Sequence, residues 1–199
     1  RIHCNKEEKV INYFTNEEIK KLLSSIDINE INGKLNFSLL TLFTYYGIRL
    51  RDVINLKLED INWNENTICF IQSKTNYVTS LPLIDEVKYP MLDYLKNERI
   101  KTSNKYIFIK RNGLRINSRY VYHIINKYFK NANIDINNKK HGAHSLRHSL
   151  ATNLINNNED IYTISKILGH SNIDDTKIYS KLNYDKLKIV SLEVPSWQI

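Results

Sequence analysis

Two β-rich runs interrupt a chain whose apolar pattern is otherwise that of helices. Residues 67–73 and 77–83 are rich in β-branched and aromatic side chains, and the polar residues 74–76 between them are suited to a tight turn. A third such run, 106–109, comes before a turn at 112–113. The sequence therefore predicts a hairpin and a small antiparallel three-stranded sheet.

The remaining segments predict helices. Thr15 and Glu18 have the spacing of a capping box and precede an apolar face, so a helix is expected over 15–25. A largely buried helix is expected over 35–47, where Gly47 can end it, and a short helix over 51–56. Further helices are predicted over 85–100, 117–131, 145–156, 160–168, 172–181 and 183–191. The simplest fold is one α+β domain, mainly helical with a small antiparallel sheet.

Length and charge narrow the class of protein. A chain of 199 residues can bury a core without metals or disulfides, and its net charge of +8 favours a polyanionic partner. Cys4 and Cys69 lie far apart and lack zinc-site spacing, which indicates reduced thiols and a cytoplasmic protein. No apolar run approaches the roughly 18 residues of a membrane span, and no signal peptide is visible.

The most informative chemistry lies near the C-terminal end. The segment 144–148 reads His-Ser-Leu-Arg-His, and Leu168-Gly169-His170 and then Tyr179 follow it. Arginine can neutralise the non-bridging oxygens of a phosphodiester, histidine can move protons, and tyrosine can attack phosphorus. On a helix His144 and Arg147 share a face and can converge on one phosphate. A hydrolase would not need the tyrosine, and a metal nuclease would show carboxylate clusters.

Other interpretations of the histidines are weaker. His144 and His148 have the i, i+4 spacing of a metal pair, but the glutamate of a zincin and a downstream ligand are missing. His123 and His141 have no comparable partner and are expected to be loop, surface or core residues.

Together with two earlier segments, these motifs resemble the signature of the tyrosine recombinases, the phage integrase family. Gly47, Arg49 and Asp52 match the family's Gly-x-Arg-x-x-Glu/Asp motif. Arg51 is a competing basic residue, and register from Gly47 favours Arg49. In Leu-Gly-His-x8-Tyr only Tyr179 has the right spacing, although Tyr184 lies nearby.

The hairpin also resembles that of the family, in which a turn lysine enters the DNA minor groove. Here this residue is Lys74, in a segment that runs through Leu81-Pro82-Leu83. The family often has further basic residues after the lysine, whereas this chain has Tyr77, Val78 and Thr79. A solvated turn lysine is the alternative for Lys74, and a surface Arg–Asp pair is the alternative for Arg49 with Asp52.

The resemblance implies an enzyme that cleaves and rejoins DNA through a 3′-phosphotyrosine link, without a metal or another cofactor. It implies double-stranded DNA as the partner, bound by a homotetramer, and no membrane. The implied catalytic residues are Arg49, Lys74, His144, Arg147, His170 and the nucleophile Tyr179, with Asp52 in support. Additional DNA contacts are expected at Lys110, Arg111, Arg115 and Arg119, although a solvated charged face is nearly as good an account of each.

The resemblance also divides the chain. Residues 1–181 are expected to be the catalytic domain. Because the catalytic motifs begin by residue 47, the family's N-terminal DNA-clamping domain is not expected within this chain, which opens at Arg1 without methionine, as a fragment of a longer protein would. Residues 182–199 form a tail that can pack on a neighbouring protomer or on its own domain. The divergent tail and skewed composition favour the integrase or transposase of a mobile element. A chromosome-dimer resolvase, an inverting recombinase, a type IB topoisomerase and a non-cleaving DNA-binding regulator are the alternatives.

Overall fold

The computed structural model describes residues 13–136, 139, 141–157 and 168 of the chain. These residues form helices and three short strands, as the sequence predicts. In chain order the elements are α1 (Asn16–Ser24), α2 (Gly33–Thr41), the π-helix η1 (Leu42–Tyr46), α3 (Leu50–Asn55), the short 3-10 helix η2 (Leu58–Asp60), β1 (Ile61–Asn62), β2 (Thr67–Ile71), β3 (Val78–Pro82), α4 (Asp85–Asn97), α5 (Ser118–Asn131) and α6 (Ala143–Asn156).

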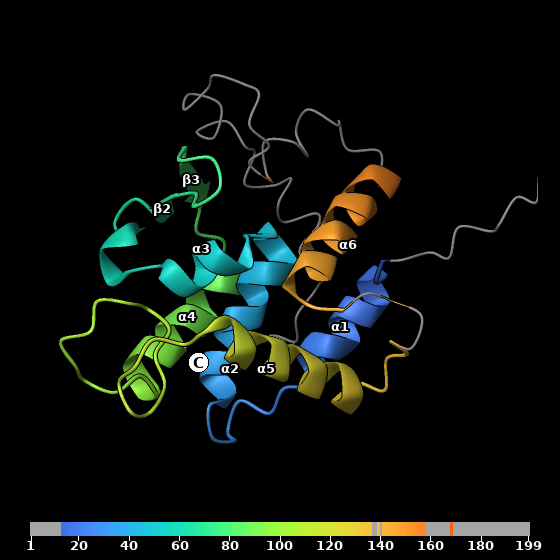
Figure 1. Ribbon diagram of the computed structural model, residues 1–199, viewed down its shortest axis with the longest axis horizontal. Coiled ribbons are helices and arrows are strands. Elements are labelled where there is room, and N and C mark those ends of the chain that lie inside the picture. The colour runs from blue at the N-terminus through green and yellow to red at the C-terminus, as the bar shows by residue number, and fades with distance from the viewer. Residues whose placement is uncertain (1–12, 137–138, 140, 158–167, 169–199) are drawn as a thin grey trace, which may run out of the picture.

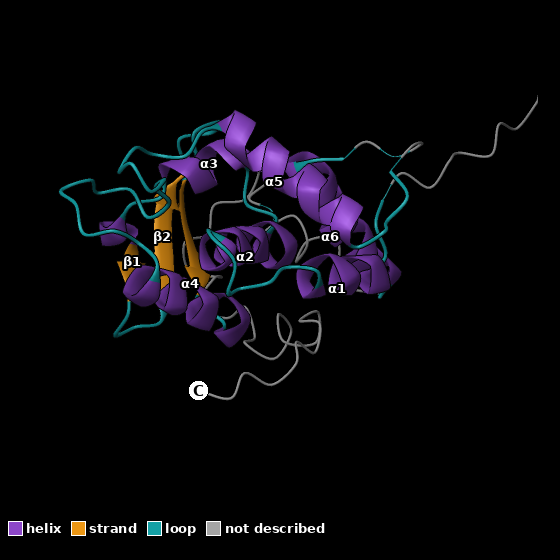
Figure 2. Cartoon of the chain, turned by 90° about the horizontal axis from the view of Figure 1, so that it is seen from below, coloured by secondary structure: helices purple, strands orange, loops and turns teal. Residues whose placement is uncertain are grey.

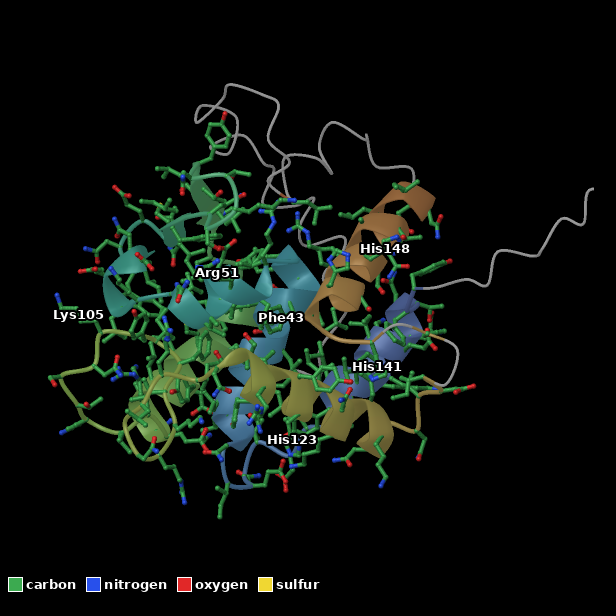
Figure 3. The ribbon with its side chains drawn as sticks, in the orientation of Figure 1. Phe43, Arg51, Lys105, His123, His141 and His148 are labelled. Carbon is green, nitrogen blue, oxygen red and sulfur yellow. The ribbon has the colours of Figure 1, made fainter. Side chains whose placement is uncertain are left out.

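The sheet lies at one end of the molecule, with α3 and α4 beside it. The strands are at one end in Figures 1 and 2, α1 and α6 are at the other, and α2 lies between them. The continuous helix formed by α2 and η1 runs through the core, where it packs on α4 and α6. Phe43, near the middle of the view in Figure 3, has no exposed surface. This helix is buried on almost all sides, and its mainly apolar side chains account for this central place.

The N-terminal helix begins as predicted. The Thr15 hydroxyl accepts a hydrogen bond from the Glu18 amide, and the Glu18 carboxylate accepts one from the Thr15 amide. This reciprocal pair satisfies two amide groups that a helix start leaves without a backbone partner. The predicted capping box is confirmed.

The predicted hairpin is confirmed, with shorter strands. The sheet order is β1-β2-β3, with antiparallel pairing throughout. Ile68 pairs with Leu81 and Phe70 with Thr79, and all four side chains are buried. The strands end at Ile71 and Val78 because the backbone between them closes a turn over the predicted polar tip.

The third strand was predicted in the wrong place. Tyr106–Ile109 forms only isolated bridges, and β1 takes the third position in the sheet. Ile107, Phe108 and Ile109 are all buried, and the Tyr94 hydroxyl and the Arg99 guanidinium donate hydrogen bonds to carbonyl groups of this run. These side chains satisfy backbone groups that a neighbouring strand would otherwise satisfy.

The helix predicted over 35–47 is present, but it begins at Gly33 and widens into a π-helix over Leu42–Tyr46. The helices expected over 51–56, 85–100, 117–131 and 145–156 correspond to α3, α4, α5 and α6. Those expected over 160–168, 172–181 and 183–191 lie outside the described residues, apart from Leu168. No helix in the described ranges is long and apolar enough to span a membrane.

Candidate active site

A tight turn after the π-helix places Arg49 beside a cavity. Gly47 ends the π-helix in the left-handed region, with φ of 58°, and Arg49 is the extended residue from which α3 begins. Glycine adopts this conformation readily because it lacks a Cβ. The cavity is small, opens to solvent and lies between the turn, the hairpin and α6. Its lining comprises Tyr46, Ile48, Arg49, Asp52, Phe70, Gln72, Thr79, Leu81, Arg147 and Leu168.

Arg147 reaches the same cavity from α6. Its two terminal nitrogens donate hydrogen bonds to the Gly47 carbonyl oxygen, at 2.6 Å, and to the Leu168 carbonyl oxygen. These bonds join residues that are distant in sequence, and they fix the guanidinium beside the turn that carries Arg49.

Two guanidinium groups therefore share one small space. Burial, together with the neighbouring positive charge of Arg49, lowers the pKa of Arg147 from 12.5 to about 10, and the Asp52 carboxylate opposes the change. At this pKa Arg147 remains charged at neutral pH. Asp52 is the only acidic residue in the lining, so the described part of the cavity keeps an excess of positive charge. Such a site is electrostatically suited to an anion.

Asp52 is 3% exposed and binds the base of the hairpin turn. Its Oδ1 accepts hydrogen bonds from the Ser73 amide, at 2.8 Å, and from the Ser73 hydroxyl. The sequence predicted an Arg49–Asp52 pair on one helical face. In the structure the carboxylate anchors the segment that leads to Lys74.

The proton-moving candidates are not among the described residues that line the cavity. Lys74 is exposed in the hairpin turn, and His144 is exposed in the first turn of α6, three residues before Arg147. Neither side chain forms a hydrogen bond or ion pair with the residues that the structure describes. Arg51, the competing basic residue, is exposed and does not line the cavity (Figure 3). His170 and Tyr179 lie outside the described residues.

Gln72 is not among the site residues that the sequence predicts, yet its side-chain oxygen accepts a hydrogen bond of 2.6 Å from Arg49. A usable signal was present. The buried side chains of β2 alternate at Ile68 and Phe70, and the next position on that face is Gln72, which is 4% exposed. A polar side chain on the inward face of a strand needs hydrogen-bond partners, and its neighbours are therefore candidates for a site.

The other basic candidates lie away from the cavity lining. Lys110 is half-buried, and Arg111, Arg115 and Arg119 are exposed. Arg115 donates a hydrogen bond of 2.5 Å to Asn55 and lies over the Tyr106 ring, with the guanidinium carbon 4.6 Å from its centroid.

The remaining described histidines do not gather into a metal site. Figure 3 shows His123, His141 and His148 at separate places, on α5, before α6 and on α6. No group of three histidine, cysteine, aspartate or glutamate side chains suited to a metal occurs among the described residues. His141 instead stacks on Tyr122, with ring centroids 6.0 Å apart.

Comparison with known proteins assigns the chain to one family. A profile described as the phage integrase family matches residues 12–186. The chain belongs to the phage integrase family. It is 34% identical over 180 residues to the tyrosine recombinase XerC of Caldanaerobacter subterraneus subsp. tengcongensis, covering 88% of this chain and 49% of that protein. It is 31% identical over 191 residues to the tyrosine recombinase XerH of Campylobacter jejuni subsp. jejuni, covering 92% of this chain and 52% of that protein.

Solved structures of the phage integrase family have the same fold. The crystal structure of XerA recombinase aligns with a TM-score of 0.69 and 27% sequence identity, covering 89% of this chain and 62% of that chain. The predicted α+β recombinase fold is therefore confirmed. This phage integrase family member spans about half the length of the curated relatives that it matches, 49% and 52% of the two proteins above.

Proposed function

We propose that this chain cleaves and rejoins DNA strands at specific sites, with Tyr179 as the nucleophile. One observation carries the proposal: Arg49 and Arg147 line one cavity, and their charges are close enough to lower the pKa of Arg147. Two partly buried positive charges at one point are unfavourable in the free protein. They become favourable when a phosphodiester lies between them.

In the proposed reaction the Tyr179 oxygen attacks the scissile phosphorus, and the bond from phosphorus to the 5′ oxygen breaks. The negative charge on the phosphoryl oxygens increases in the transition state, where Arg49 and Arg147 bind them. The planar forks of the two guanidinium groups suit these oxygens and stay charged at neutral pH. The product is a 3′-phosphotyrosine and a free 5′ hydroxyl. Attack by a 5′ hydroxyl of a partner duplex reverses the step.

The protons move through three other side chains. A tyrosine hydroxyl has an ordinary pKa of about 10, so its attack requires a base, which we assign to His144. Lys74 gives a proton to the departing 5′ oxygen. His170 donates a hydrogen bond to a non-bridging oxygen. The exposed positions of Lys74 and His144 support these roles, because both side chains are accessible to bound DNA.

The proposed partner is double-stranded DNA, bound by four copies of the protein in the cytoplasm. The net charge of +8 supports this partner, and the contacts assigned to Lys110, Arg111, Arg115 and Arg119 remain predictions. We propose residues 1–181 as the catalytic domain and 182–199 as a tail that packs on a neighbouring protomer or on its own domain. A role in moving a mobile element remains a prediction from the tail and composition.

The test uses the full-length protein on nicked suicide duplexes that carry the sequences flanking its own gene. Products are resolved on a denaturing gel. We expect a covalent adduct between the protein and the 3′ phosphate end of the cleaved strand. We expect Tyr179→Phe to bind the duplex without forming this adduct. An adduct that survives Tyr179→Phe would remove Tyr179 from the reaction. Specific binding without any adduct from the unsubstituted protein would favour a non-cleaving regulator.

A further inference from the structure

The Gln72 side chain connects Arg49 to both strands of the hairpin. Its Oε1 accepts hydrogen bonds from Arg49, at 2.6 Å, and from the Thr75 hydroxyl, at 3.1 Å. Its Nε2 donates to the Thr79 hydroxyl at 2.7 Å. The orientation of the amide follows from chemistry, because a guanidinium can only donate and must therefore face the oxygen.

The backbone of the same residue closes the turn that carries Lys74. The Gln72 amide donates to the Tyr77 carbonyl, and the Gln72 carbonyl accepts from the Asn76 amide, both at 2.9 Å. Residues 73–76 are thus enclosed between hydrogen bonds made by Gln72. The Thr75 hydroxyl adds a bond from inside the turn to the Gln72 side chain.

We propose that Gln72 is a positioning residue that holds the Arg49 guanidinium and the Lys74 turn in a fixed relation to each other. This inference rests on the proposed function, because it gives Arg49 and Lys74 the roles assigned above. The two groups act on different oxygens of one phosphorus centre, since Arg49 binds non-bridging oxygens and Lys74 protonates the leaving oxygen. A buried side chain that holds both groups in place determines the distance between the Arg49 guanidinium and the Lys74 ammonium.

A purely structural role is a poorer account of this position. Ile68 and Phe70 on the same face of β2 fill the core with apolar side chains, and a methionine at 72 could do the same. Instead the strand carries an amide whose oxygen is shared between a site arginine and the turn. Its hydrogen bonds within a buried setting restrict Arg49 to one rotamer and order the turn.

The primary variant is Gln72→Met, which keeps the approximate length and volume of the side chain and removes its hydrogen bonds. At saturating protein, we expect the first-turnover rate of adduct formation on a suicide duplex to fall by about 10- to 100-fold, the scale of a small misplacement in an active site. DNA affinity should change little, because Gln72 is buried. Cys69→Ser is the matched control, an exposed position on the same strand whose thiol contacts Ser80.

Two modified duplexes separate positioning from general loss of structure. A methylphosphonate at the scissile position is neutral, so its cleavage depends less on the positive charge of Arg49. A sulfur in place of the bridging 5′ oxygen leaves as a thiolate and has less need of a proton from Lys74. We expect each modified duplex to reduce the Gln72→Met defect several-fold. Arg49→Ala should be relieved only by the methylphosphonate, and Lys74→Ala only by the sulfur.

Gln72→Glu provides a second variant that keeps an acceptor for Arg49 and Thr75. Its carboxylate also neutralises Arg49. We therefore expect a defect on the normal duplex that the methylphosphonate relieves and the sulfur does not.

The outcomes distinguish failure of the positioning role from failure of the proposed function. Gln72→Met that cleaves like Cys69→Ser would overturn the positioning role, and so would an equal defect on all three duplexes. If the unsubstituted protein forms no adduct on any duplex while it binds them specifically, the proposed function itself is wrong.

Discussion

Gly47 matters both for the fold, because it ends the π-helix, and for the proposed site, because its carbonyl group binds Arg147. Its φ of 58° lies in the left-handed region, and its carbonyl oxygen accepts the hydrogen bond from Arg147. A Cβ at this position would lie 3.0 Å from Leu168 Cδ2, 3.2 Å from Leu150 Cδ2 and 3.3 Å from Arg147 Cγ. The Gly47→Ala substitution therefore adds backbone strain and crowds three side chains together.

The expected cost has two parts. A left-handed conformation costs an alanine roughly 1–2 kcal/mol. Overfilling a packed site costs roughly 1–3 kcal/mol more. Gly113→Ala is the matched control, because Gly113 has φ of 79° but its nearest neighbours would lie at 3.7 and 3.8 Å from the new Cβ. Only the backbone part applies there, so its free energy of unfolding should fall by about 1–2 kcal/mol.

The assay compares urea unfolding with single-turnover adduct formation on a suicide duplex, at a temperature where both variants are folded. We expect Gly47→Ala to be the less stable variant by about 1–3 kcal/mol, because it alone adds crowding. We also expect it to form adduct at least about ten times more slowly, because the new methyl group presses on Arg147. Gly113→Ala should cleave at the unsubstituted rate. Equal losses of stability, or unchanged cleavage by Gly47→Ala, would refute the reasoning.

Two further predictions concern charged side chains. Asp52→Ala removes the acceptor of both Ser73 hydrogen bonds and the only carboxylate among the described residues of the cavity lining, so the melting temperature and the rate of adduct formation should both fall. Asp52→Asn, which keeps one acceptor oxygen, should lose less stability in the same calorimetric scan. The pKa of Glu30 is lowered from 4.5 by hydrogen bonds from Lys127 and Tyr128, so its ionised form stabilises the fold above pH 4.5 and this contribution is lost as pH falls through the lowered pKa. Glu30→Gln should therefore lower the melting temperature at pH 7 and flatten its acid dependence, and an unchanged pH profile would contradict this.

The parts of the fold that depend on neighbouring residues could be predicted from the sequence. The capping box at Thr15, the hairpin turn at 74–76 and the helix end at Gly47 each depend on a few adjacent residues. The run 106–109 was mistaken for a sheet strand because its composition is that of a strand. Its backbone partners include the side chains of Tyr94 and Arg99, which composition does not indicate.

The contacts in the site also divide into those within one segment, which the sequence indicates, and those between segments, which it does not. The spacing between Arg49 and Asp52 indicates a shared helical face, but not that the Asp52 carboxylate binds Ser73. The bond from Arg49 to Gln72 also joins α3 to the end of β2. Both contacts depend on how the hairpin packs against the turn after the π-helix, and the spacing of residues within one segment carries no information about that packing.

The arginine pair is easier to explain by the binding of an anion than by stabilisation of the fold. Burial and the neighbouring charge of Arg49 lower the pKa of Arg147 from 12.5 to about 10, so the free protein holds this charge at a cost. An apolar side chain in its place would avoid that cost but could not donate to the Gly47 and Leu168 carbonyls. Those two bonds explain why an arginine is tolerated at position 147, but they do not explain why Arg49 lies beside it. A bound oxyanion accounts for both residues, because it would relieve their repulsion and bind more tightly as its negative charge increases.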